Sequence, residues 1–131
     1  MSAKTIAKDR YFTKDHEWID FQGSVAYVGI GNFKLTGFKQ IQQINFNDPF
    51  GFKSRGEIIA TVKYNDYLIE VQMPVNGKIV ELNKDLLSDN LNVLLQHAED
   101  NCWIARIIPS EPYERKGLIP PKDYRMNRKS K

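Results

Sequence analysis

Cysteine and histidine are scarce in this chain of 131 residues, which has Cys102 as its only cysteine and His16 and His97 as its only histidines. One cysteine cannot form an internal disulfide, so we expect a reducing compartment and a cytoplasmic protein. Two histidines far apart in the sequence, without a second cysteine, do not match a zinc-binding pattern, and we expect no metal site. Cys102 is expected to be a small buried residue beside a strand.

Long apolar segments are also missing. No run of apolar residues approaches the roughly 20 that an α-helix needs to cross a bilayer. Residues 1–10 contain no long apolar stretch, so neither a membrane span nor a cleaved secretory signal is expected. No cysteine–histidine or serine–histidine–aspartate set has local support in the sequence, so we do not expect an enzyme.

An excess of basic over acidic residues is found only at the two ends of the chain. The net charge is +3, yet residues 11–109 hold 9 basic and 12 acidic residues. Residues 110–131 hold seven basic and three acidic residues, and such a tail could contact nucleic acid or an acidic protein. A nucleic-acid-binding domain is expected to have a basic face on its folded part, which this mildly acidic middle does not offer. Binding through the basic tail is therefore a second alternative and not the leading hypothesis.

Short β-rich segments separated by turn residues fill most of the chain. The expected strands cover residues 17–21, 25–30, 41–46, 58–62, 67–73, 78–82 and 103–108. Turns are expected at Gln22-Gly23-Ser24 and at Pro74-Val75-Asn76-Gly77. Many short strands with little helix predict an all-β fold, either a small sandwich or a flattened barrel.

Helix is expected at only a few short places. Asn32 is expected to cap one or two helical turns through Phe38, and leucines with helical spacing predict a short helix over residues 86–95. Prolines after residue 111 exclude a long helix there and leave one turn near Lys122–Tyr124. The expected organisation is an N-terminal extension over 1–10, one domain over 11–110, and a basic, proline-containing tail over 111–131.

Two motifs occur in this chain in an informative order. His16-Glu17-Trp18 closes the first, residues 11–19, which resembles the opening motif of the H protein family of the glycine cleavage system. Gly56 to Val62 followed by Met73 to Ile79 resembles the hairpin on which lipoyl domains carry their cofactor. The resemblance implies an all-β lipoyl-type domain of the hammerhead kind, with a few short helices. It also implies a non-catalytic carrier whose partners are glycine cleavage or lipoate-handling enzymes.

One position departs from the family pattern. In H proteins the lysine that carries lipoate lies at the hairpin tip, ten residues after the glycine of the motif and eight before its proline. Counting from Gly56 and counting back from Pro74 lead to the same residue, which is Asp66. A carboxylate has no amine with which to form an amide to lipoate. The resemblance implies lipoate as the cofactor, but this residue predicts that the chain carries none.

Lys63 is the nearest amine, three residues before Asp66. Three is an odd number, so in an extended strand the Lys63 side chain would leave from the opposite face. A functional lipoyl carrier modified at another lysine such as Lys63 is nevertheless the first alternative.

The candidate partner-binding residues fall in two groups. The first is the hairpin tip, which consists of Tyr64, Asn65, Asp66 and Tyr67. Rigid aromatic area beside polar groups is favoured at protein interfaces, although an ordinary polar turn is the other interpretation. The second group is His16 and Glu17, for which the resemblance implies a cleft that faces a ligand or partner. The other interpretation is that His16 and Trp18 anchor the first hairpin by packing and hydrogen bonding. We therefore expect an H-like binding or regulatory module without lipoate.

Overall fold

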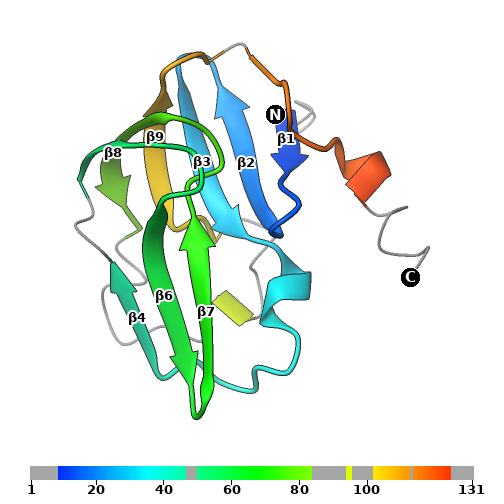
Figure 1. The fold of residues 1–131 in the computed structure, drawn as a ribbon, viewed down its shortest axis with the longest axis vertical. Coiled ribbons are helices and arrows are strands. Elements are labelled where there is room, and N and C mark those ends of the chain that lie inside the picture. The colour runs from blue at the N-terminus through cyan, green and yellow to red at the C-terminus, as the bar shows by residue number, and fades with distance from the viewer. Residues whose placement is uncertain (1–8, 47–49, 84–93, 96–101, 113, 125–131) are drawn as a thin grey trace, which may run out of the picture.

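The computed structural model describes residues 9–46, 50–83, 94–95, 102–112 and 114–124. Two antiparallel sheets dominate these residues (Figure 1). The strands are β1 (Asp9–Phe12), β2 (Glu17–Gln22), β3 (Val25–Ile30), β4 (Gln43–Phe46), β5 (Gly51–Lys53), β6 (Ile58–Tyr64), β7 (Tyr67–Gln72), β8 (Gly77–Leu82) and β9 (Ala105–Pro109). The all-β fold predicted from the sequence is confirmed.

The larger sheet has six strands in the order β1-β2-β3-β9-β8-β5. Its second and third strands form the β2–β3 hairpin, in which Gln22 pairs with Val25 and Gly23 has a φ of 65°. Glycine accepts this left-handed conformation without steric cost, which explains the predicted turn at this point. The sheet places the opening motif, at the start of β2, beside the end of β3.

The smaller sheet has three strands in the order β4-β6-β7, so β7 is one of its edges. The long β6–β7 hairpin extends away from the larger sheet, and its tip lies at one end of the molecule (Figure 1). Along β7 the exposed or half-buried residues alternate with Ile69, Val71 and Met73, of which Val71 and Met73 are buried. This is the alternation that the sequence predicted for the returning strand.

The main core lies between the two sheets. Residues from both contribute to one cluster, including the fully buried Val28 and Ile107 of the larger sheet and Val62 and Val71 of the smaller. Each large aliphatic side chain buried in this way contributes about 1.5–3 kcal/mol relative to an exposed position. Cys102 belongs to the same cluster and is buried, as predicted.

Several elements differ from the sequence prediction. The helix expected from Asn32 to Phe38 is only a 3₁₀ turn, η2 (Asn32–Leu35), and its N-cap is Gly31 without a side-chain cap bond. Strand β5 was not predicted, and β9 begins two residues later than expected. The helix expected over 86–95 lies outside the described residues except for its end, where residues 94–95 are helical.

Part of the predicted tail packs against the domain. Phe12 and Ile119 exchange two backbone hydrogen bonds of 2.8 Å, which adds a short bridge at the free edge of β1. Residues 121–124 form a helical turn, and Tyr124 is only 3% exposed because its ring stacks on Phe12. Residues 114–124 therefore form a strap along this edge, while Asp9 and Arg10 of the expected N-terminal extension belong to β1.

Candidate functional site

The β6–β7 turn is as short as an antiparallel hairpin allows. Tyr64 pairs with Tyr67, so Asn65 and Asp66 are the two turn residues. Asn65 has a φ of 53°, a left-handed conformation that asparagine tolerates better than most residues. Asp66 lies at the apex, where its side chain is exposed. The turn is therefore shorter than residues 63–66, the gap between the expected strands 58–62 and 67–73, because Lys63 and Tyr64 still belong to β6.

Gln42 supports this turn from the segment that precedes β4. Its side-chain amide donates to Asn65 Oδ1 at 3.2 Å, and its Oε1 accepts the backbone N–H of Asn65 at 2.8 Å. The Gln42 backbone N–H also donates to the carbonyl of Lys63 at 2.9 Å. These three bonds fix the orientation of a turn whose side chains face solvent.

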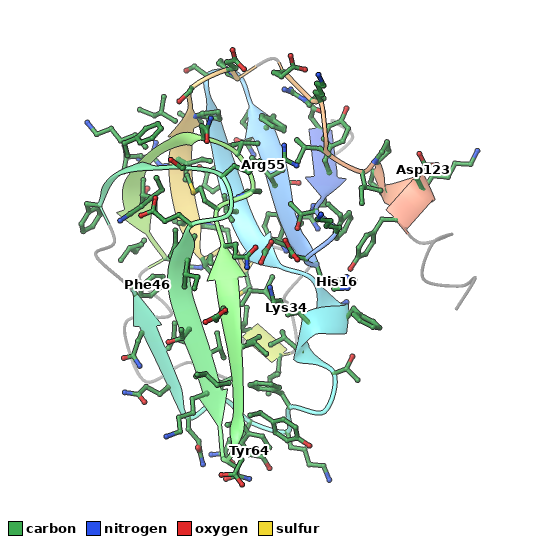
Figure 2. The ribbon with its side chains drawn as sticks, viewed as in Figure 1. His16, Lys34, Phe46, Arg55, Tyr64 and Asp123 are labelled. Atoms are coloured by element: carbon green, nitrogen blue, oxygen red, sulfur yellow. The ribbon has the colours of Figure 1, made fainter. Side chains whose placement is uncertain are left out.

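Three aromatic rings gather at the tip. Tyr64 and Tyr67 stack with their ring centroids 6.2 Å apart, and Phe38 contacts both, at 6.0 and 5.8 Å. Tyr67 remains 54% exposed, and its neighbour Leu68 is 60% exposed. We call Phe38, Tyr64 and Tyr67 the tip patch; Figure 2 places Tyr64 at this end of the molecule. Phe38 was not among the predicted residues, since nothing in its local sequence indicates a contact with the hairpin.

Lys63 lies within β6 and not in the turn. It pairs with Leu68 of β7 and with Gln43 of β4, all of them exposed. Side chains that face each other across strands share one face of the sheet, so Lys63 lies on the outer face. Tyr64 follows it in the strand and points to the other face, toward Phe38.

The second group of candidate residues lies at the opposite end of β7. Glu17 is 1% exposed, and its carboxylate accepts three hydrogen bonds: from the Thr13 hydroxyl (2.8 Å), the Lys34 ammonium (2.6 Å) and the backbone N–H of Gln72 (3.0 Å). The bond to Gln72 joins β2 of the larger sheet to β7 of the smaller. Lys34 supplies the compensating charge and is 14% exposed. A buried carboxylate bound in this way is satisfied by the chain itself.

His16 is held in place by the C-terminal strap. Its backbone has a φ of 70°, and its carbonyl accepts the N–H of Gly31 at 2.7 Å. Its Nδ1 lies 2.7 Å from the Tyr124 hydroxyl, and its ring contacts Phe33 at 4.4 Å. These contacts join the first hairpin to the strap and fit the structural interpretation of His16, while its role in binding a partner stays a prediction.

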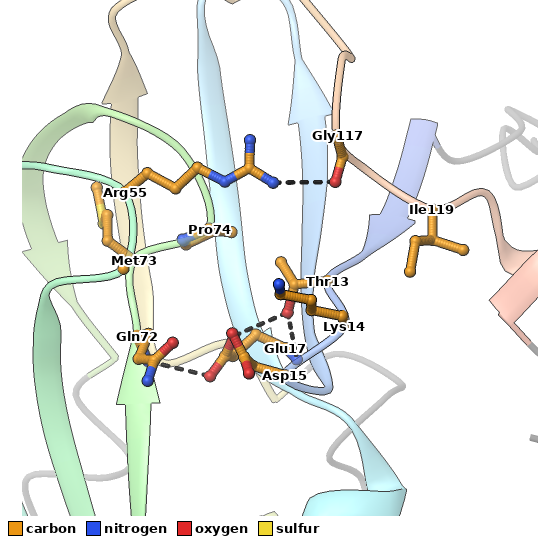
Figure 3. A pocket seen from close by; sticks show the side chains of 11 residues that line it. Thr13, Lys14, Asp15, Glu17, Arg55, Gln72, Met73, Pro74, Gly117 and Ile119 are labelled. Carbon is orange, nitrogen blue, oxygen red and sulfur yellow. Dashed lines mark hydrogen bonds between the residues drawn. The ribbon is translucent and has the colours of Figure 1, made fainter.

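A cavity of about 490 Å³ lies between the strap and the turns next to β6 and β7. Its polar lining includes Glu17, Asp15 and Lys14 on one side and Arg55 on the other. Arg55 reaches across it and donates to the carbonyl of Gly117 at 2.9 Å, while Glu17 lies between Thr13 and Gln72 (Figure 3). Both charge signs line this cavity, so its electrostatics favour neither anions nor cations.

Comparison with known proteins agrees with this geometry. A family model described as glycine cleavage H-protein matches residues 10–131. The chain belongs to the glycine cleavage H-protein family. It is 30% identical over 121 residues to the glycine cleavage system H protein of Alkaliphilus oremlandii, with 92% of this chain and 93% of that protein covered. It is 29% identical over 119 residues to glycine cleavage system H protein 4 of Aquifex aeolicus, with 91% and 69% covered.

The fold is also that of a solved H protein. The crystal structure of the glycine cleavage system H protein from Mycobacterium marinum superposes with a TM-score of 0.78 at 22% identity, covering 95% of this chain and 99% of that one. H proteins are carriers and not catalysts, and the family normally carries lipoate and works with the glycine cleavage enzymes. Within the described residues, no helix is long and apolar enough to cross a membrane.

The structure separates the two predicted groups of residues. The tip and Glu17 lie at opposite ends of β7, which puts them about 16 Å apart along the strand. Sequence reasoning missed Lys34, Gln42 and Arg55, the polar residues that complete these regions. Their partners are distant in sequence, so no local pattern could have identified them. His97 lies outside the described residues.

Proposed function

We propose that this H-protein family member carries no lipoate and acts as a non-catalytic binding or regulatory module. Its contact surface is the hairpin tip, Tyr64 to Tyr67, and its partner is a protein of the glycine cleavage or lipoate-handling machinery. The observation that carries the proposal is Asp66 at the apex of the β6–β7 turn, with its side chain exposed. A surface at the apex is where a carrier hairpin presents its attachment residue to other proteins.

The chemistry at the apex does not fit covalent lipoate. Lipoylation joins an activated carboxyl group to a side-chain amine, and Asp66 offers a second carboxylate. In the part of the chain that the structure describes, Asp66 makes no hydrogen bond or ion pair through its side chain. The residue is thus available to a partner but has no group that lipoate can modify.

The geometry at Lys63 argues against it as a substitute. Its backbone belongs to the paired part of β6, and its carbonyl is bonded to Gln42. The Lys63 side chain also leaves from the sheet's outer face, three residues before the apex. An enzyme that recognises a lysine at the end of a hairpin would meet Asn65 and Asp66 there.

The tip patch supports the binding role. The order of the turn comes from Gln42 and the ring contacts, so its exposed aromatic surface is largely organised before any partner binds. Preorganised aromatic side chains lose little conformational entropy on association, which is why they often dominate interfaces. We infer that Tyr67 and Asp66 make the central contacts.

Intact-mass spectrometry tests the absence of lipoate. The full chain is produced in cells with an active lipoylation system, beside Asp66→Lys and Lys63→Arg variants. We expect no lipoyl increment on the natural chain and an increment on Asp66→Lys, which shows that the host's ligase accepts this hairpin. An increment on the natural chain that disappears in Lys63→Arg would overturn the proposal in favour of a carrier modified at Lys63.

A further inference from the structure

Strand β7 has an unpaired edge next to the tip. In a hairpin with a two-residue turn, the residues beside the turn form a hydrogen-bonded pair, and bonded pairs then alternate with non-bonded ones. Tyr64–Tyr67 and Val62–Ile69 are therefore bonded pairs, whereas Leu68 and Glu70 direct their N–H and C=O groups away from β6. Since β7 is the last strand of its sheet, these groups face the open edge.

Two hydrogen bonds of the structure agree with this register. The carbonyl of Lys63, opposite Leu68, is directed to the other side of β6, where it accepts the N–H of Gln42. Two residues beyond Glu70, the N–H of Gln72 points out of the sheet to the carboxylate of Glu17. Within the described residues, the hydrogen bonds found outside the strand ladders do not involve the backbone of Leu68 or Glu70. As far as the structure describes the chain, the edge is therefore closed at Gln72 and open from Leu68 to Glu70.

The charged residues of the turn and of β7 have one sign, while the nearest cation on the same face, Lys63, lies on β6, one strand in from the edge. The turn and β7 together contain Asp66 and Glu70, both exposed, and no basic residue. The exposed Leu68 lies between them on the outer surface, and the ring of Tyr67 flanks the same end. A strand that pairs here would gain from basic side chains beside the two carboxylates and from an apolar side chain against Leu68.

We propose that the open stretch of β7 receives an extended, basic and partly apolar segment of a partner protein as an added strand. This inference rests on the function proposed above, since it names the chemistry of the partner that the tip would recognise. Strand addition obtains affinity from main-chain hydrogen bonds and selectivity from the flanking side chains. A second copy of this chain is a poor occupant, because pairing two β7 edges would bring Glu70 and Asp66 near their own counterparts.

Amide hydrogen exchange on the ¹⁵N-labelled full chain tests the inference with two hexapeptides. Because Leu68 and the two carboxylates are spaced by two residues and share one face, one peptide has lysine, valine and lysine at every second position with threonine between them. The other has glutamate in place of lysine. At saturating concentration, the Lys/Val peptide is expected to slow exchange of the Leu68 and Glu70 amides by about tenfold, because they become hydrogen-bonded. The Glu/Val peptide is expected to leave them unchanged.

Charge reversal sharpens the test. The variant Glu70→Lys is expected to lose the response to the Lys/Val peptide and to respond to the Glu/Val peptide instead. Its matched control is Asn45→Lys, an exposed substitution on β4 at the other edge of the same sheet, which should respond as the natural chain does. No added protection at Leu68 and Glu70 with either peptide, or equal protection on β4, would overturn the inference. Protection that grows with protein concentration alone would assign the edge to a second copy and also overturn it.

The two proposals fail separately. A lipoyl increment on the natural chain would refute the proposed function, whatever the exchange data show. If the chain is unmodified and neither peptide slows hydrogen exchange of its β7 amides, strand addition is refuted and the tip patch remains as the proposed binding surface.

Discussion

A carboxylate lies at each end of β7, and the two differ in burial and in hydrogen bonding. At one end Glu17 is buried and accepts hydrogen bonds from Thr13, Lys34 and Gln72. At the other end Asp66 is exposed at a turn and has no bonded partner among the described residues. Carboxylates that hold a fold together are satisfied internally, whereas an exposed one at an ordered turn remains available for recognition. The comparison indicates a structural role for the Glu17 end and leaves the tip with the binding role that we propose for it.

Removing the charge that compensates Glu17 should have the largest effect. Lys34→Met leaves a buried carboxylate without its cation, and we expect a loss of about 3 kcal/mol in the free energy of unfolding. Urea denaturation measures it, with Lys39→Met at an exposed position as the control, expected within about 0.5 kcal/mol. Adding Glu17→Gln to Lys34→Met should recover part of the loss, because it removes the uncompensated charge. Equal effects at positions 34 and 39 would mean that this ion pair does not stabilise the fold.

A smaller effect is expected where the C-terminal strap meets the opening motif. Tyr124→Phe removes the hydroxyl that lies 2.7 Å from His16 Nδ1, at a position that is 3% exposed. We expect a loss of about 1 kcal/mol in unfolding free energy, the usual net value of one hydrogen bond.

The same chemical change at the tip provides the matched control. Tyr64→Phe removes a hydroxyl with no hydrogen bond among the described residues, so thermal or urea unfolding should barely change. If the two variants lose equal stability, the strap is not anchored through His16, and the contrast between the two ends of the molecule fails there.

The sequence predicted local features better than contacts between distant segments. Alternation along residues 67–73 was sufficient to predict β7 and its buried face. Gly23 and Asn65, which lie in hairpin turns, have the positive φ angles that these residue types tolerate. Strand β5 was missed because Gly51-Phe52-Lys53 has only three residues, too few to show an alternation, and its phenylalanine is exposed. Local sequence patterns predict that a segment is a strand but not which strand pairs with it in the sheet.

The candidate site shows the same division. Asp66 could be placed at the turn by counting within the hairpin, because the turn is a local structure. The pairing of Lys34 with Glu17 could not be predicted in this way, since it joins a 3₁₀ turn to a strand that only the folded chain brings together. The strap was also underestimated: its prolines exclude a long helix, yet Ile119 and Tyr124 dock on β1 through one backbone bridge and one stacked ring.

The smallest effect on stability is expected at the apex itself. Asp66→Lys changes an exposed side chain without a bonded partner, in a turn whose geometry depends on Asn65 and Gln42. We expect the unfolding free energy to stay within about 0.5 kcal/mol of the natural chain, as measured by urea denaturation. Folding would then place no demand on the residue at the apex, and the aspartate would have to be explained by what the hairpin binds. A loss of several kcal/mol would instead make Asp66 a structural residue, and its presence would no longer speak for a change of function.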